Sequence, residues 1–192
     1  MEGMRFKGDE ELVRRVDAAV QAGSKEETTE QIANTLCEMI RSGELQMPEE
    51  VLQPVEGHYA RRLMYRSPEH GYSMVAMTWG PEQGTPIHDH AGLWCVESVC
   101  HGAIKVVQYE LQEDEGDRCR FSEEDRIQAG IGTAGCLIPP HEYHTIRNNC
   151  GEQAAVTLHI YGGDMQCCNV FEPLGDGWYK KIEKSLCFDK AS

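Results

Sequence analysis

The stretch Gly84-Thr-Pro-Ile-His-Asp-His90, read together with Pro139-Pro-His-Glu-Tyr-His144, decides what we expect of this chain. Alternate side chains of an extended strand share a face, so His88 and His90 point the same way while the aspartate between them points to the other side. His144 lies far along the chain, so a metal bound by the three histidines would join two distant strands. Three neutral imidazoles leave a divalent ion its full charge and open coordination positions, which favours a catalytic over a structural metal site.

From the N-terminus onward, the sequence predicts helices first and strands afterwards. Residues 9–22 and 25–42 carry apolar side chains at helical spacing, and each run ends at a glycine. After Pro54 the sequence changes to β-branched and aromatic runs broken by glycine and proline. These runs predict strands at 72–79, 95–99, 103–111, 136–138 and 154–161.

We therefore expect an all-β body, a β-barrel or two-sheet roll, with N-terminal α-helices packed on its outside. The acidic stretch between Glu110 and Gln128 is interpreted as a solvated hairpin between two strands. At 192 residues and 40% hydrophobic content, the chain suits a single domain. We expect this domain to cover 1–192, with a helical segment over 1–50 and the β-barrel over 55–192.

Charge and cysteine content indicate a cytoplasmic protein. The chain has 18 basic and 32 acidic residues and a net charge of −14, which argues against nucleic acid or an acidic membrane as partner. The N-terminus lacks a hydrophobic signal segment, and no apolar run reaches the length that spans a bilayer. The nine cysteines form no Cys-x-x-Cys pair, so we expect reduced thiols, and zinc held by cysteines is a poor interpretation.

The histidine motifs resemble those of the cupin barrel, a jelly-roll-like fold. The first motif corresponds to His88-x-His90, four residues, Cys95, six residues and Gly102, and the second to Pro139-x-His141-x-x-His144-x-x-x-Asn148. Most cupins have a glutamate ligand where this chain has Cys95. That departure is typical of the thiol dioxygenases.

Across residues 58–168 the chain resembles a bacterial cysteine dioxygenase with an arginine carboxylate anchor. The resemblance rests on motifs in the correct order and spacing: Tyr59-Ala-Arg61, Trp79-Gly80, Ile87-His-Asp-His90, Cys95, His144 and Leu158-His-Ile-Tyr161. It implies that His88, His90 and His144 hold a mononuclear Fe(II). It also implies that Arg61 grips the substrate carboxylate through two hydrogen bonds and that Tyr59 adds a hydroxyl donor.

The resemblance further implies catalytic roles for Cys95, Tyr161 and His159. In cysteine dioxygenases the positions of Cys95 and Tyr161 form a thioether crosslink beside the iron, and the sequence leaves open whether the crosslink forms here. Thr157 and His159 share a strand face with Tyr161, so we expect a hydrogen-bonded chain that orients the phenol.

The expected activity is the oxidation of L-cysteine by O2 to cysteine sulfinic acid, with L-cysteine and O2 as the only partners. An alternative is a dioxygenase of another small thiol such as 3-mercaptopropionate, although Arg61 and Cys95 favour cysteine. A non-catalytic metal-binding cupin and a zinc hydrolase that uses the same histidines also stay open, because imidazole suits zinc as well as iron. We expect a monomer, and an oligomer stays open because the sequence shows no interface signal.

Overall fold

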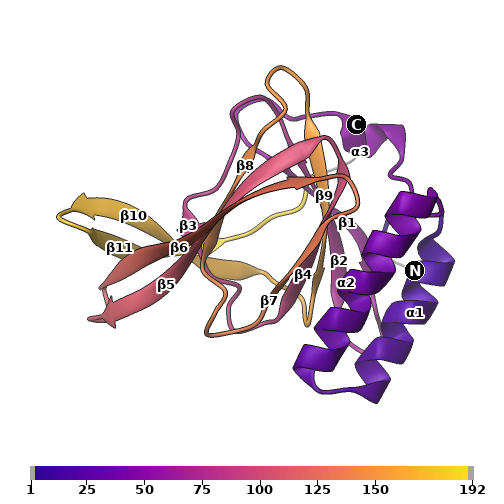
Figure 1. The fold of residues 1–192 in the computed structure, drawn as a ribbon, viewed down its shortest axis with the longest axis horizontal. Helices are drawn as coiled ribbons and strands as arrows, with labels where there is room; N and C mark the ends of the chain where they lie inside the picture. Colours follow the sequence, from indigo (N-terminus) through magenta and orange to yellow (C-terminus); the bar gives the residue numbers. More distant parts are fainter. Residues whose placement is uncertain (1–2, 190–192) are drawn as a thin grey trace.

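The chain folds into two antiparallel β-sheets with helices on one side of them (Figure 1). The computed structural model describes residues 3–189, so the extreme ends of the predicted domain lie outside the described residues. The helices are α1 (Asp9–Ala22), α2 (Lys25–Ser42) and α3 (Glu49–Leu52). The strands are β1 (Ala60–Arg66), β2 (Ser73–Trp79), β3 (Ile87–His88), β4 (Cys95–His101), β5 (Ala103–Asp114), β6 (Arg118–Gly130), β7 (Ala134–Leu137), β8 (His144–Asn148), β9 (Ala155–Tyr161), β10 (Cys167–Gly175) and β11 (Trp178–Ser185).

The two long helices begin and end where the sequence predicts. Ser24 opens α2 with a capping box: its hydroxyl accepts from the backbone N–H of Glu27, and the Glu27 carboxylate accepts from the backbone N–H of Ser24. Gly43 ends α2 in the left-handed conformation, with φ of 74°. In the described part of the chain, no helix is both long and apolar enough to span a bilayer.

The sheets form the predicted all-β barrel. One sheet has the strand order β1-β2-β9-β4-β7, and the other, β10-β11-β6-β5-β8-β3, closes on itself because β3 pairs with both β10 and β8. Gly102 alone joins β4 to β5, with φ of 71°, and an added Cβ there would lie 2.7 Å from the Cys150 sulfur. The closed arrangement brings β3 and β8, which carry predicted ligands, into direct contact.

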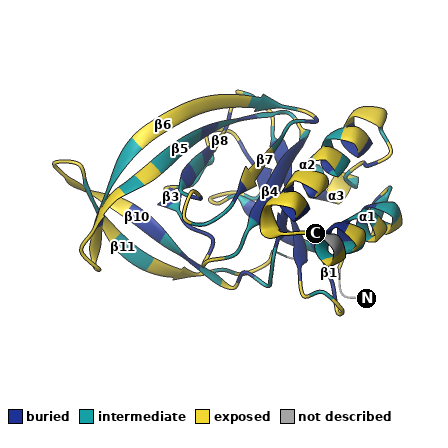
Figure 2. Cartoon of the chain, turned by 60° about the horizontal axis from the view of Figure 1, so that its bottom comes forward, coloured by how far each residue is buried: buried dark blue, intermediate teal, exposed yellow. Residues whose placement is uncertain are grey.

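The helices cover the outer face of the five-stranded sheet, as predicted, and the inner face of that sheet lines the barrel (Figure 2). On β9, Val156, Leu158 and Ile160 pack in the same apolar cluster as the helices. The residues between them lie on the opposite face. Tyr161 belongs to the cluster inside the barrel, so the candidate catalytic side chains of β9 point to the interior.

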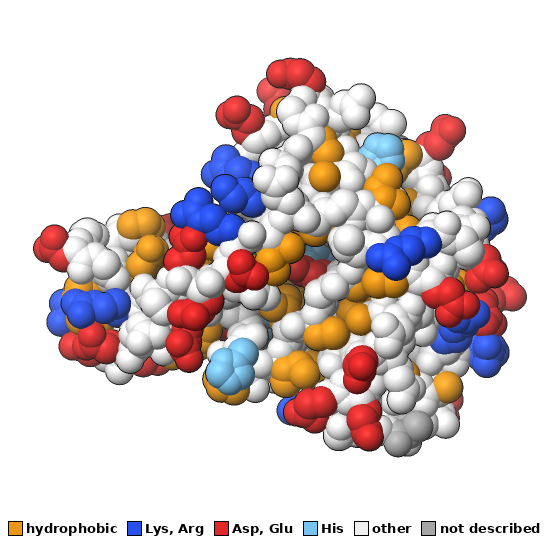
Figure 3. Space-filling view, viewed as in Figure 1, with side chains coloured by type: hydrophobic (Ala, Val, Ile, Leu, Met, Phe, Trp, Pro, Cys, Tyr) orange, Lys and Arg blue, Asp and Glu red, His pale blue; other side chains and the backbone are white. Residues whose placement is uncertain are grey.

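Strands β5, β6, β10 and β11 extend beyond the barrel as a projecting arm (Figure 1). The acidic stretch lies mostly within these strands, since only residues 115–117 separate β5 from β6. The sequence ends the first of these strands too early, at Leu111, because the residues that follow in β5 are exposed and the apolar alternation fades. Acidic and basic side chains alternate over its surface (Figure 3).

Candidate metal and thiol site

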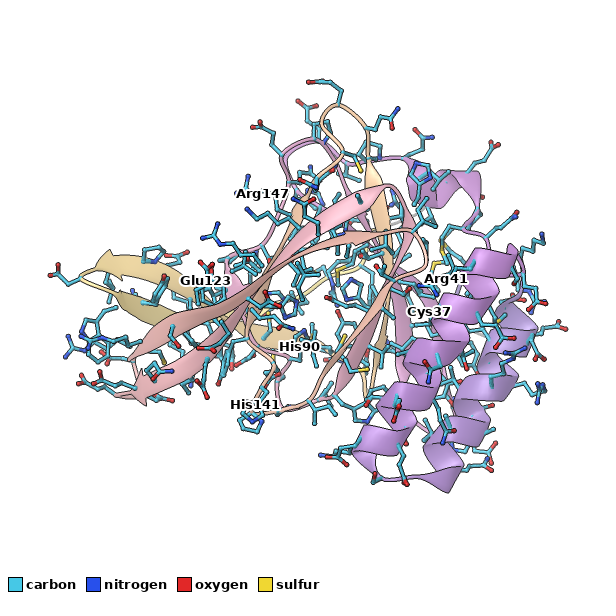
Figure 4. All side chains as sticks on the ribbon, viewed as in Figure 1. Cys37, Arg41, His90, Glu123, His141 and Arg147 are labelled. Carbon is cyan, nitrogen blue, oxygen red and sulfur yellow. The ribbon has the colours of Figure 1, made fainter. Side chains whose placement is uncertain are left out.

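Three histidines meet at the junction of β3 and β8. His88 ends β3 and pairs directly with His144, the first residue of β8, while His90 follows two residues after His88. One potential ligand atom from each of the three lies within 4.8 Å of the others. His90 lies inside the barrel, whereas His141, which is exposed, projects at its rim (Figure 4). The structure therefore brings the three predicted ligands together.

Each of these histidines uses Nδ1 for a contact within the protein. His88 Nδ1 lies 3.2 Å from the Pro86 carbonyl oxygen, and His144 Nδ1 lies 2.9 Å from the Glu142 carbonyl oxygen. His90 Nδ1 lies 3.2 Å from a carboxylate oxygen of Glu142, which also accepts the backbone N–H of His90 at 2.7 Å. Protons on Nδ1 leave the Nε2 lone pairs free, as metal ligation by imidazole requires.

The histidines fit a metal by burial as well as by geometry. His144 Nε2 is buried and has no hydrogen-bond partner among the described residues. Burial lowers the pKa of His88 to about 3 and that of His144 well below its ordinary value, and the neighbouring histidines lower both further. The rings of His88 and His144 are therefore neutral, which is the form that binds a cation.

The aspartate between the first two ligands points away from them, as the alternation predicts. Asp89 Oδ1 accepts the backbone N–H of Asn169 at 2.8 Å, and Oδ2 accepts its side-chain amide at 2.6 Å. Asn169 lies on β10, the second neighbour of β3. This contact fixes the backbone that presents His88 and His90.

A small cavity connects the histidines to the predicted substrate-binding residues. Its lining includes Tyr59, Arg61, His88, Tyr161 and Cys168. The Tyr59 ring stacks on Trp79 with centroids 4.7 Å apart, so Trp79 forms part of the wall. The two residues predicted to bind the carboxylate thus share one cavity with His88, one of the candidate metal ligands.

Arg61 and Arg62 are both buried but have different surroundings, because adjacent strand residues face opposite ways. Arg62 points to the helical side, where its guanidinium donates to Thr78 Oγ1 and to the Gln53 carbonyl oxygen, each at 2.9 Å. Arg61 lines the cavity, and its Nε and Nη2 are buried with no hydrogen-bond partner among the described residues. These two nitrogens form one edge of the guanidinium, the edge that fits a carboxylate.

Residues 187–189, near the C-terminus, pack against Arg61 and bond to its backbone. The Cys187 carbonyl oxygen accepts from Arg61 Nη1 at 3.4 Å, and the guanidinium carbon lies 5.1 Å from the centre of the Phe188 ring. Asp189 bonds to the Arg61 backbone twice, through its carboxylate at 2.8 Å and its own N–H at 2.7 Å. The sequence did not suggest these contacts, because nothing in it links residue 61 to residues 187–189.

Cys95 and Tyr161 face each other across neighbouring strands, Cys95 on β4 and Tyr161 on β9. Both are buried, and burial raises the pKa of the thiol and of the phenol above their ordinary values. A hydrogen bond with Tyr161 slightly offsets the shift of Cys95. The pair has the adjacency that a sulfur-to-ring bond requires.

A hydrogen-bonded chain crosses the inner face of β9, as the sequence predicts, but it reaches Tyr161 by ring contact only. Trp79 Nε1 donates to Thr157 Oγ1 at 2.9 Å, and Thr157 Oγ1 lies 2.7 Å from His159 Nε2. The rings of His159 and Tyr161 are stacked with centroids 5.9 Å apart, while His159 Nδ1 lies 3.9 Å from the Cys95 sulfur.

Sequence reasoning missed Glu97. This residue is buried inside the barrel, and its Oε2 lies 3.6 Å from His144 Nε2 and 3.6 Å from His159 Nδ1. Burial raises its pKa to about 8. The signal was available, since strand alternation places Glu97 on the same face as Cys95.

Comparison with known proteins identifies the family. The family model described as cysteine dioxygenase type I matches residues 56–173. The chain belongs to this family. Every predicted site residue of the chain lies inside the matched range.

Cysteine dioxygenase type 1 proteins of animals are similar at low identity. The protein of Danio rerio is 23% identical over 174 residues, covering 77% of this chain and 81% of that protein. That of Rattus norvegicus is 20% identical over 101 residues, covering 53% of this chain and 50% of its own length. Among solved structures, an RmlC-like cupin protein from Desulfovibrio desulfuricans is 18% identical with a TM-score of 0.44, covering 61% of this chain and 94% of that chain.

Proposed function

We propose that this member of the cysteine dioxygenase family is an iron-dependent enzyme that oxidises L-cysteine with O2 to cysteine sulfinic acid. Both atoms of O2 are transferred to the thiol sulfur, so the reaction balances without an external reductant. The observation that carries the proposal is the buried, unpaired edge of Arg61 in the cavity that also contains His88 and Tyr161. A small thiol with a carboxylate fits this arrangement.

Arg61 and Tyr59 bind the substrate in this proposal. The Nε and Nη2 of Arg61 donate two parallel hydrogen bonds to the carboxylate, and the Tyr59 hydroxyl adds a third. Fe(II) held by His88, His90 and His144 would supply the open positions at which thiolate and dioxygen are brought together.

Tyr161, Cys95 and His159 complete the site in this proposal. The Tyr161 hydroxyl donates a hydrogen bond to the substrate, and its raised pKa keeps the proton on the phenol. A thioether bond from Cys95 would fix the ring. His159, held by Thr157, supports the ring by stacking against it.

Oxygen consumption tests the proposal directly. Anaerobically Fe(II)-loaded protein is given L-cysteine, 3-mercaptopropionate and cysteamine in parallel, and the products are identified by mass. We expect uptake with L-cysteine and a product heavier by two oxygen atoms. Preference for 3-mercaptopropionate would keep the reaction and change the substrate, whereas no uptake with any thiol would favour a non-catalytic cupin.

Arg61→Ala separates carboxylate binding from the rest of the site. Loss of a charged, bidentate contact should lower kcat/KM for L-cysteine by at least about tenfold. Cysteamine has no carboxylate, so its kcat/KM should change little and serves as the internal control. An equal loss with both thiols would contradict the assigned role of Arg61.

A further inference from the structure

We propose that Glu142 is a positioning residue of the metal site, which holds His90 and, through that ring, lowers the reduction potential of the bound metal. The proposal rests on the metal site of the proposed function, which gives Glu142 no role. Glu142 is buried and lies two residues before His144, the first residue of β8. Both side chains are buried, while His141 is exposed and Tyr143 half-buried, so Glu142 points inward as His144 does.

One carboxylate oxygen of Glu142 holds both the backbone and the ring of His90. Oε2 accepts the backbone N–H of His90 at 2.7 Å and lies 3.2 Å from His90 Nδ1. A carboxylate can only accept hydrogen bonds, so Nδ1 carries the proton and Nε2 presents its lone pair. The two contacts fix the orientation of the ring relative to its own backbone, so Nε2 is held in one direction before a metal binds.

The backbone of Glu142 acts on a second ligand. Its carbonyl oxygen lies 2.9 Å from His144 Nδ1, which leaves Nε2 of that ring unprotonated as well. Residue 142 therefore sets the tautomer of two of the three ligands, one through its side chain and one through its main chain. It also ties the segment around His90 to the start of β8.

The three ligands are not equivalent at Nδ1. His88 and His144 each meet a neutral backbone carbonyl oxygen, whereas His90 meets a carboxylate. A carboxylate on the far nitrogen raises the basicity of an imidazole ligand more than a neutral acceptor does. His90 is therefore expected to be the strongest electron donor of the three.

Burial makes the charge of this carboxylate effective at the metal. The side chains of His90 and Glu142 are only 1% and 6% exposed, so water screens their interaction weakly. A nearby negative charge stabilises the more highly charged oxidation state of a metal. Glu142 thus favours Fe(III) relative to Fe(II), which is a lower reduction potential.

A carboxylate behind a histidine adds charge without occupying a coordination position. Most cupins bind the metal with a glutamate at the position of Cys95, and that ligand both donates electrons and fills one position. Glu142 acts on the metal through His90, so the three-histidine site stays open to thiolate and O2. The position of the carboxylate therefore reconciles an open site with a metal that is easily oxidised.

A redox titration without thiol tests the proposal. Wild type, Glu142→Gln and Glu172→Gln are reconstituted with Fe(II), and the midpoint potential of each is measured. Glu172 is an exposed glutamate on β10, so Glu172→Gln matches the change in charge. We expect Glu142→Gln to lower the ratio of Fe(III) to Fe(II) affinity by at least about tenfold, a rise of about 59 mV for a one-electron couple, and Glu172→Gln to leave it unchanged.

Competition titration with Co(II) measures the positioning role separately. Loss of the partner of His90 should weaken Co(II) binding to Glu142→Gln by at least about tenfold, while Glu172→Gln binds as the wild type does. A folded Glu142→Gln protein with the wild-type potential would overturn the proposal, and so would wild-type Co(II) affinity in that variant. Equal shifts in Glu172→Gln would overturn it too.

If Glu142→Gln does not fold, the crystal structure of the Co(II)-loaded wild type decides. A Glu142 oxygen within about 3.2 Å of His90 Nδ1, with His90 Nε2 about 2.1 Å from the metal, supports the proposal. A Glu142 oxygen on the metal itself, or one beyond about 3.5 Å from His90 Nδ1, rejects it. Because no thiol is present in these experiments, failure of the thiol oxidation assay leaves their results unaffected.

Discussion

The two faces of strand β9 are equally buried and differ completely in chemistry. On the outer face, Val156, Leu158 and Ile160 are each 0% exposed and pack in the cluster formed with the helices. On the inner face, His159 and Tyr161 are 2% and 1% exposed and lie beside the three histidines of the candidate metal site. Burial by itself therefore does not separate the structural face from the functional one.

Groups of unpaired polar atoms that lie close together distinguish the inner face. Arg62 Nε, on the helical side, also has no partner among the described residues, but the other two nitrogens of that guanidinium both donate hydrogen bonds. Arg61, Glu97 and His144 all point into the barrel, and each keeps a buried atom without a hydrogen-bond partner among the described residues. Each such atom costs about 1–3 kcal/mol of folding free energy. That cost is tolerated where a metal or a substrate supplies the missing partner, so the inner face is organised for ligands and the outer face for packing.

The largest expected effect comes from removal of an inner-face ligand. His144→Ala should weaken Co(II) or Fe(II) binding by at least about 100-fold, because one of three imidazole ligands is lost. His141→Ala, at an exposed position outside the site, is the control and should bind as the wild type does. A competition titration measures both, and near-wild-type affinity in His144→Ala would remove these histidines from the metal site.

On the outer face the effect should fall on stability. Leu158→Ala should lower the free energy of unfolding by about 2–5 kcal/mol, and Ile160→Val by about 0.5–1.5 kcal/mol, because both leave cavities against the helices. Urea unfolding measures the change. The metal affinity of the folded fraction should be unaltered, and a parallel loss of metal affinity would show that the two faces are coupled.

A conservative change on the inner face should lower stability and turnover to a smaller degree. Thr157→Val leaves Trp79 Nε1 and His159 Nε2 without their partner, at a cost of about 1–3 kcal/mol in stability. We expect kcat to fall several-fold with little change in KM, because His159 loses its support. Thr157→Ser keeps the hydroxyl and should restore both values, so an equally impaired serine variant would assign the effect to packing.

The smallest effect is expected on the arm, which belongs to neither face. Arg126 pairs with Glu123 at the exposed surface of β6. Water already solvates both groups, so Arg126→Ala should leave the urea midpoint and the metal affinity within experimental error. A clear shift in either would show that the arm contributes to the barrel.

The fold was predictable from the sequence where a periodic pattern and a terminal signal coincide. The two long helices have apolar spacing and a glycine after each, and β9 is a continuous run of strand-forming residues. Strand β1 was missed because Arg61 and Arg62 look like surface residues, whereas both are buried by contacts with distant segments. Such contacts leave no local pattern.

The candidate site was predictable to a similar extent. Spacing and family resemblance predicted roles in the site for the three histidines, Arg61, Cys95 and Tyr161. In the structure these residues lie around the interior of the barrel. Glu97 was missed because a single glutamate on a strand has no motif of its own. Strand alternation places it on the same face as Cys95, but its proximity to His144 Nε2 comes from the fold.

Strand β3 is only two residues long, and it closes the ring of the second sheet by pairing His88 with β8 on one side and with β10 on the other. These pairings join parts of the chain that are distant in sequence, so closing them costs loop entropy, and we expect them to form late in folding. A chain that has not closed its ring has no complete set of ligands. Metal uptake by the newly made protein therefore reports the completion of folding, and a refolding experiment followed by metal capture would time the last step of barrel assembly.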